Sequence, residues 1–322
     1  MLFQSTEEIR QYLPVSSAID FENLKPHIIQ IENDFIKPLL GSRYEIVNTY
    51  YNDGQSSDFL PELISAAQNA IIHLAYWRGF DVLNAYISDG GFKRSESDKV
   101  KSLFKYQEDN LREYFKTIGF NALDSMLERL EKFVDHITNN GGIDEDWYIA
   151  THDDFINNAK QFSEIYEING SRLVFLRLKK YMKQVKDLQL KPLLGNQNWD
   201  YLLTEFASPV CDFRIKQIVP YIQMPLVFLA VALLLEDSGA DLTDKGLVYD
   251  GKISAHGGDV AKIPAEKERV AQLIARNKKI GESYMNQLKQ YLIDNATIWN
   301  DYAAPASGVG NRDNVGKKSF WV

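Results

Sequence analysis

One five-residue segment occurs twice in this 322-residue chain, and it constrains the fold more than any other feature. Lys37-Pro38-Leu39-Leu40-Gly41 recurs as Lys191-Pro192-Leu193-Leu194-Gly195, 154 positions later. Self-similarity at a fixed spacing indicates a chain built from repeated units. The glycine suits the C-terminal cap of a helix, where φ is positive, and the proline has to sit where its missing N–H does no harm.

The residues on both sides of this segment keep nearly the same spacing. Upstream, Phe21, Leu24, Ile28 and Ile31 correspond to Phe175, Leu178, Met182 and Val185 at the same offset. Steps of three and four residues place such side chains on one face of a helix. Downstream, Gln68, Leu74 and Ala75 correspond to Gln223, Leu229 and Ala230 at an offset of 155. The sequence therefore predicts a mainly α fold with two tandem helical-bundle modules related by internal duplication.

Both modules are expected to contain the same succession of helices. A first helix ends at the repeated segment, a short helix follows around 44–50 and 199–206, and a long central helix comes next. Residues 215–235 are apolar on almost all sides, which predicts that the second central helix is the more buried one. A last helix is expected at 97–116 and, at an offset of 170, at 265–292. The first module then adds a helix at 121–136.

An Asp-x-Gly element, Asp89/Gly91 and Asp244/Gly246, follows each central helix. Aspartate accepts backbone N–H groups and glycine adopts positive φ, so the pattern predicts a structural turn rather than a catalytic site. The offset of 170 implies about 15 additional residues in the second module, at 248–262. They are expected to form a short β-hairpin or a mobile loop.

The predicted boundaries are 1–137 for the first module, 138–160 for a polar linker, 161–302 for the second module and 303–322 for a tail. Strand-like residues 162–168, with a turn after them, open the second module, so minor β structure in short hairpin or strand segments is expected. The tail carries Phe320 and Trp321, which either dock on a neighbouring molecule or are incidental aromatics of a disordered tail. Together with Tyr249 of the additional loop, they are the candidate partner contacts.

Composition argues against several functional classes. The net charge of -8 and the scattered basic residues disfavour specific nucleic-acid binding. The most apolar run, 225–235, is shorter than the ~20 residues of a membrane span, so we expect a buried helix. No signal peptide is recognised, which favours the host cytoplasm or a virion as location. The single cysteine, Cys211, cannot form an intrachain disulfide.

The search for reactive groups predicts no catalytic, cofactor-binding or metal-binding residue. The five histidines form no helical metal-binding pair, and one cysteine gives no zinc spacing. His73, on the central helix, is interpreted as a partly buried residue with its hydrogen bonds satisfied. We therefore do not expect an enzyme or a cofactor.

The repeated segments, the long central helix and the turn at 242–247 resemble an uncharacterised family of Bacteroidales and phage-associated proteins. That family is similar in outline to the helical adaptors of tailed-phage head–tail connectors, and the resemblance covers roughly 21–302. It implies a non-enzymatic assembly protein that self-associates or binds portal-like neighbours, and no catalytic residues. This chain departs from typical adaptors by holding two modules instead of one.

Two other hypotheses stay open. One is a host-encoded helical module that binds a peptide or small molecule in the groove between the two copies, which a deep apolar pocket with a few polar groups would favour. The other is an enzyme, which would need clustered titratable side chains in one cleft.

Overall fold

The computed structural model describes residues 1–14, 21–53, 60–83, 85–88, 91–94, 103–139, 154–208, 211–238, 241–242, 248–249 and 262–296. The chain divides into two compact units, Met1–Trp147 (unit 1) and Tyr148–Val322 (unit 2). The described part of the chain is mainly helical, as the sequence predicts.

The two units have the same order of elements. Unit 1 contains α1 (Thr6–Ile9), α2 (Phe21–Ile31), the π-helix η1 (Glu32–Ile36), α3 (Lys37–Leu40), α4 (Arg43–Asp53), α5 (Leu60–Leu83), β1 (Ala85–Ser88), β2 (Gly91–Arg94) and α6 (Lys105–Asn139). Unit 2 contains α8 (Ala159–Ile165), α9 (Arg172–Val185), the π-helix η2 (Lys186–Leu190), α10 (Lys191–Leu194), α11 (Asn196–Ala207), α12 (Phe213–Ser238), β3 (Asp241–Leu242), β4 (Val248–Tyr249) and α13 (Lys262–Asp294).

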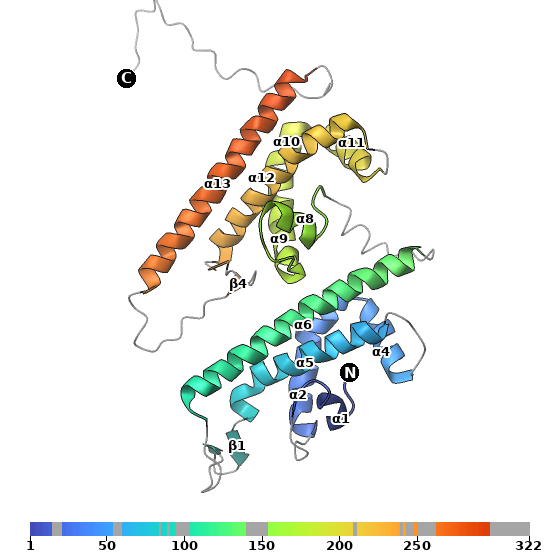
Figure 1. Ribbon diagram of the computed structural model, residues 1–322, viewed down its shortest axis with the longest axis vertical. Helices are drawn as coiled ribbons and strands as arrows, with labels where there is room; N and C mark the ends of the chain where they lie inside the picture. Colours follow the sequence, from blue (N-terminus) through green and yellow to red (C-terminus); the bar gives the residue numbers. More distant parts are fainter. Residues whose placement is uncertain are drawn as a thin grey trace, which may run out of the picture. The chain divides into compact units, whose positions relative to one another are not determined.

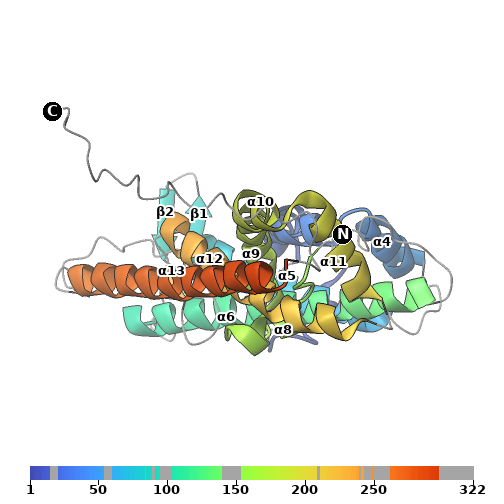
Figure 2. The same ribbon diagram turned by 90° about the horizontal axis from the view of Figure 1, so that it is seen from above.

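A pair of long helices forms the centre of each unit. In Figure 1 and again in Figure 2, α5 runs along α6, and α12 runs along α13. α2 packs on α5, and α9 packs on α12. β1 and β2 pair antiparallel, as do β3 and β4, so each central helix is followed by a short two-stranded ribbon.

The central helix of unit 2 is surrounded by other helices. α8, α9 and α13 all contact α12, and Ile222, Leu226, Val227 and Val231 are fully buried. By length and composition, Phe213–Asp237 could span a membrane, but 67% of its most apolar window is buried inside the unit. Such burial is typical of the core helix of a globular fold.

A π-helical turn precedes the Lys-Pro-Leu-Leu-Gly segment in each unit. In η1 the Lys37 N–H donates to the Glu32 carbonyl, five residues earlier. A proline ring in a regular α-helix clashes with the carbonyl four residues before it. The wider π turn relieves this clash, so the chain stays helical through Pro38. η2 repeats the arrangement before Pro192.

Both segments end at a glycine with positive φ. The φ of Gly41 is 57° and that of Gly195 is 82°, and each glycine N–H donates to the lysine carbonyl four residues earlier at 2.8 Å. Residues with a side chain rarely adopt this backbone conformation. The glycine therefore ends one helix and lets the next start in a new direction.

Two local predictions are wrong. Residues 97–116 and 121–136 were expected as separate helices, but α6 is continuous from Lys105 to Asn139. Gly119, which suggests a break, lies inside the helix and permits a close approach to α5. The predicted strand at 162–168 is largely helix α8, whose N-cap is Asn158. The turn after it is confirmed, because Asn169 and Gly170 both have positive φ.

The register of the last helix also differs from the prediction. A Cβ on Gly119 would lie 2.6 Å from Leu74 Cγ, and a Cβ on Gly281 would lie 2.5 Å from Leu229 Cγ. Gly119 therefore corresponds to Gly281 at an offset of 162, not 170. Since the central helices match at 155, unit 2 has seven additional residues here rather than about 15. A shift of eight residues is close to two helical turns, so both registers keep much of the same apolar face.

Candidate functional site

A charged side chain is buried at the first position of each π-helix. Glu32 is 3% exposed in unit 1 and Lys186 is 6% exposed in unit 2, and the two lie 154 positions apart. A buried charge is costly unless it is paired and hydrogen-bonded. The groups that pair with Glu32 and Lys186 therefore offset the cost of burying these two charges.

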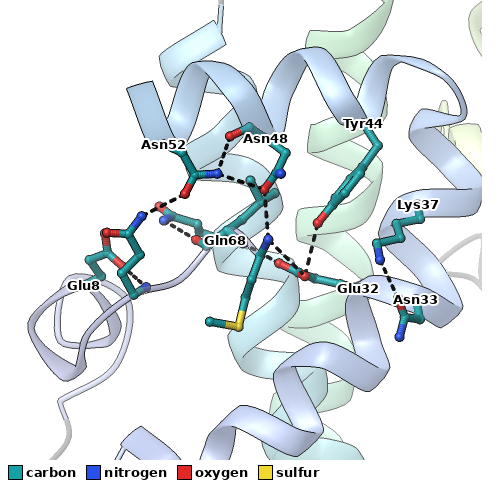
Figure 3. Close-up of polar contacts among 11 residues, drawn as sticks. Glu8, Glu32, Asn33, Lys37, Tyr44, Asn48, Asn52 and Gln68 are labelled. Atoms are coloured by element: carbon teal, nitrogen blue, oxygen red, sulfur yellow. Dashed lines mark hydrogen bonds and ion pairs between the residues drawn. The ribbon is translucent and has the colours of Figure 1, made fainter. Parts of the chain in front are cut away.

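Glu32 lies at the centre of a polar cluster in unit 1 (Figure 3). Its carboxylate accepts hydrogen bonds from the Leu2 N–H at 2.5 Å and from the Tyr44 hydroxyl at 3.3 Å. The Met1 ammonium lies 3.9 Å from the same carboxylate and donates to Asn48 Oδ1 at 2.8 Å. Burial raises the pKa of Tyr44, and the charge of Glu32 raises it further. Tyr44 therefore remains a hydrogen-bond donor at neutral pH.

In each unit, a glutamine on the central helix donates a hydrogen bond to the opening segment, which contains Leu2 in unit 1 and Phe155 in unit 2. Gln68 Nε2 donates to the Leu2 carbonyl at 2.6 Å, and Gln223 Nε2 donates to the Phe155 carbonyl at 2.9 Å. Leu2 and Phe155 are both fully buried. Leu2 in unit 1 and Phe155 in unit 2 thus occupy matching places.

The ion pair next to this segment has opposite polarity in the two units. In unit 2, Lys186 Nζ lies 3.2 Å from Asp154 Oδ2, with side chains 7% and 13% exposed. Asp154 precedes Phe155 as Met1 precedes Leu2. A buried anion therefore receives a cation in unit 1, and a buried cation receives an anion in unit 2.

The first short helix of each unit has the same reciprocal cap. Ser5 Oγ accepts from the Glu8 N–H at 3.4 Å, and Glu8 accepts from the N–H before Ser5 at 2.7 Å. Asn158 Oδ1 and Gln161 Oε1 accept the corresponding hydrogen bonds at 2.9 and 2.8 Å. This is a variant of the capping box that stabilises helix N-termini. The similarity between the units thus begins at their first residues, well before Phe21.

A groove of about 570 Å³ lies between α5 and α6 of unit 1. Pro61, Glu62, Ser65, Ala66 and Asn69 line it from α5, and Ile118, Asn121, Ala122, Ser125 and Arg129 line it from α6. Arg129 Nε lies 3.6 Å from a Glu62 carboxylate oxygen at one end. Small apolar side chains, hydroxyls and amides with one ion pair can accommodate a peptide or a side chain.

Aromatic side chains occupy the matching place in unit 2. Offsets of 155 and 162 place Tyr221 where unit 1 has Ala66, and Tyr291 where it has Arg129. The Tyr221 and Tyr291 rings stack, with centroids 5.3 Å apart and planes 28° from parallel. Tyr284 takes the place of Ala122 and stacks on the ring of Phe228. Unit 2 therefore supplies rings of its own where unit 1 has two alanines and an arginine.

Large apolar side chains are exposed just before α6 and in its first three turns. Phe104 is 70% exposed and Tyr106 63% exposed, and their rings stack at 6.0 Å. Leu103, Leu111 and Tyr114 are 42%, 38% and 50% exposed. We call these five residues the α6 patch. A group of exposed apolar side chains on one short stretch of chain marks an interaction surface more often than a single exposed side chain does.

The sequence-predicted residues of the repeated segments have structural roles. Lys37 Nζ donates to Asn33 Oδ1 at 2.7 Å, and Lys191 Nζ lies 3.8 Å from Asp187 Oδ1. Pro38 and Pro192 lie in the first turns of α3 and α10, Leu40 and Leu194 are fully buried, and Leu39 and Leu193 are partly buried. The two segments belong to different units.

The remaining predicted residues are mostly beyond the described ranges. Gly91 begins β2 and Tyr249 ends β4. Asp89, Asp244, Gly246, Phe320 and Trp321 lie outside the described residues, as does most of the additional loop predicted at 248–262.

His73 is buried, and Cys211 is partly exposed. His73 is 3% exposed, and its Nδ1 lies 2.9 Å from the Asn69 carbonyl oxygen. Burial lowers the pKa of His73. Cys211 is partly exposed, with Sγ 3.6 Å from the Asp212 carbonyl oxygen. In the ranges that the structure describes, no three His, Cys, Asp or Glu side chains are grouped to hold a metal ion.

Sequence reasoning missed Glu32 and Lys186, although a signal was present. Both directly follow the last apolar residue of the matched helix, Ile31 or Val185, and both precede the repeated segment by five positions. A glutamate and a lysine at matching positions do not count as similar residues in a search for repeats, because their charges are opposite. The matched position within a repeat would still have identified them.

The fold and these sites define a mainly helical protein whose two units share their element order, capping and central anchors. Residues 35–139 and 174–312 match a family of unknown function, DUF6712, with one matched segment in each unit. Since the match covers more than half of the chain, the protein belongs to this family. No curated protein and no solved structure matches the chain.

Proposed function

We propose that this protein is a non-enzymatic assembly protein of the head–tail connector type, encoded by a phage or prophage, with two modules that arose by internal duplication. Its task is to hold neighbouring protein subunits together. The α6 patch is the observation that carries this proposal. The shared element order and the matched glutamine anchors support the duplication.

The α6 patch has the chemistry of an interface core. Tyrosine and phenylalanine are enriched in protein–protein contacts because they bury a large area and lose little side-chain freedom. Fully burying such a side chain contributes about 1.5–3 kcal/mol. Phe104 and Tyr106, at 70% and 63% exposure, retain most of this contribution for a partner.

The experiment compares the purified chain with Phe104→Ser/Tyr106→Ser by multi-angle light scattering and mass photometry, alone and with a portal-like protein. We expect the wild-type chain to form oligomers or bind the portal-like protein. The association affinity of the variant should be at least about 30-fold lower, as for a hot spot worth about 2 kcal/mol.

Ile46→Ser on α4 is the matched control, because Ile46 is an exposed apolar residue outside the patch, at 52% exposure. It should leave assembly unchanged. A wild-type chain that stays monomeric at high concentration and ignores portal-like proteins would count against the proposal, as would equal losses in both variants. Portal, capsid and terminase genes beside the coding sequence would add independent support.

One observation favours the second function, a host-encoded ligand- or peptide-binding module. The α5–α6 groove has a volume of about 570 Å³ and a lining of amides, hydroxyls and small apolar side chains. Pockets of this size accept small molecules or peptide side chains. A thermal-shift screen against a library of metabolites separates the two functions, since an assembly protein needs no small-molecule ligand in this groove.

A further inference from the structure

We propose that the α5–α6 groove of unit 1 binds residues 317–322 of a second copy of this chain, with Phe320 or Trp321 seated over Ala66 and Ala122. The proposal rests on the assembly function above and names the partner and its contact. The copies would then join head to tail, which is a heterologous contact that can close into a ring.

The first argument is the comparison between the two units. The matching surface of unit 2 is covered by the stacked rings of Tyr221 and Tyr291, and Tyr284 occupies the place of Ala122. The same helix pair in unit 1 therefore has the backbone geometry that accepts aromatic rings, but it lacks the rings. An aromatic side chain from elsewhere fits this place.

The second argument is the chemistry of the groove walls. Asn69 and Asn121, with Ser65 and Ser125, present amide and hydroxyl groups on both sides of the apolar floor. Such groups donate to and accept from the backbone of a peptide. The Glu62 carboxylate pairs with Arg129 and is still 72% exposed, so a basic residue of a peptide can reach it as well. Residues 317–322 have the sequence Lys-Lys-Ser-Phe-Trp-Val, which places two cations beside two aromatic rings.

The third argument is the distribution of charge along the chain. Residues 1–147 contain 14 Lys and Arg against 24 Asp and Glu, whereas residues 148–322 contain 22 against 20. Unit 1 is therefore strongly acidic and unit 2 is slightly basic. Contacts between two copies of unit 1 are repulsive, and contacts between unit 1 and unit 2 of different copies are not.

The fourth argument is length. Residues 297–316 separate the last described residue of unit 2 from the proposed binding segment. Twenty residues span at most about 70 Å, which is larger than the diameter of a module of this size. The segment can therefore reach beyond its own unit to a neighbouring molecule.

The test uses two full-length variants that each remove one side of the contact. Ala66→Tyr/Arg129→Tyr copies the stacked pair of unit 2 into the groove, and Phe320→Ser/Trp321→Ser removes the aromatic rings. Ala275→Tyr on α13, an exposed position, is the control for adding a tyrosine. Circular dichroism and thermal denaturation verify that all three are folded. The second variant changes no described core residue and so keeps the test valid if the groove variant is unstable.

For each variant alone, the self-association affinity is expected to be at least about 30-fold lower than for the wild-type chain, as for an interface hot spot. A 1:1 mixture of the two should regain a dimer of twice 36.9 kDa that neither variant forms alone, because one intact groove and one intact segment remain and the α6 patch is unchanged in both. Light scattering measures this directly. A mixture that stays monomeric overturns the proposal. So does an Ala66→Tyr/Arg129→Tyr variant that associates as strongly as the wild-type chain.

Photo-crosslinking distinguishes a second copy from the same chain. Benzoylphenylalanine at position 320 is activated in an equal mixture of ¹⁴N- and ¹⁵N-labelled protein. Crosslinks to α5 or α6 that join the two isotopes support the proposal, and crosslinks confined to one isotope overturn it. If the wild-type chain assembles but neither variant matters, this contact is wrong while the assembly function stands. If the wild-type chain neither assembles nor binds a portal-like protein, the assembly function itself is wrong.

Discussion

Gly119 is the position where two opposing effects of one methyl group can be compared. The glycine lies inside α6, where α6 crosses α5, and a Cβ added there would lie 2.6 Å from Leu74 Cγ and 3.2 Å from the Leu74 backbone nitrogen. Gly119→Ala therefore adds a good helix former and a steric overlap at the same time.

The overlap should exceed the gain in helix propensity. Replacing glycine by alanine in a helix interior stabilises by about 1 kcal/mol. Overpacking a filled contact costs about 1–3 kcal/mol. The overlap involves the branch carbon of Leu74 and comes close to its backbone, so a rotation of the side-chain end does not relieve it. We expect Gly119→Ala to destabilise unit 1 by up to roughly 2 kcal/mol.

Urea denaturation followed by circular dichroism measures this change, and a double-mutant cycle tests its cause. In a Leu74→Ala background the methyl group has room, so Gly119→Ala should become neutral or stabilising there. Gly281→Ala against Leu229 provides the same test in unit 2, where the corresponding distance is 2.5 Å. A stabilisation of about 1 kcal/mol by Gly119→Ala in the wild-type chain would refute the reasoning, because propensity alone would then explain it.

Two further predictions concern buried titratable groups. Lys186→Met removes the cation beside Asp154 and should cost roughly 3 kcal/mol in urea denaturation, whereas Lys186→Met/Asp154→Leu should recover most of it; equal stabilities of the single and double variants would contradict this. Because burial lowers the pKa of His73, the unfolded chain binds the proton more readily than the folded chain. Stability should therefore fall as pH drops from 7 below the ordinary value of about 6.5, and the fall should be smaller in His73→Gln; identical pH profiles would show that His73 is not responsible.

The sequence was sufficient to predict the parts of the fold that repeat with little change. The Lys-Pro-Leu-Leu-Gly segments located the ends of the first helices. The matched residues around Leu74 and the apolar run at 225–235 located the central helices, because buried helix faces leave a direct pattern in the sequence. The mainly helical class followed from the same patterns. The π turn was not predicted. The proline is visible in the sequence, but whether the backbone before it widens into a π turn or ends the helix is not.

The errors arose where sequence pattern and three-dimensional contact diverge. Gly119 suggests a helix end in isolation, yet its reason is the contact with Leu74 on another helix. Phe162 and its neighbours have strand-forming side chains, but the cap at Asn158 and burial in the core of unit 2 stabilise a helix. The groove was not predictable, because it depends on the register between α5 and α6, and a shift of two turns leaves the apolar pattern nearly unchanged.

The exchanged polarity of the buried pairs has a consequence for how the chain folds. Tandem units with similar cores are prone to misassembly, in which a segment of one packs in the other. The segment at Asp154 would bring a carboxylate against Glu32, and the segment at Met1 would bring its ammonium against Lys186. Each exchange would bury two like charges in contact, which is strongly unfavourable. We therefore expect the two ion pairs to favour packing of each opening segment in its own unit.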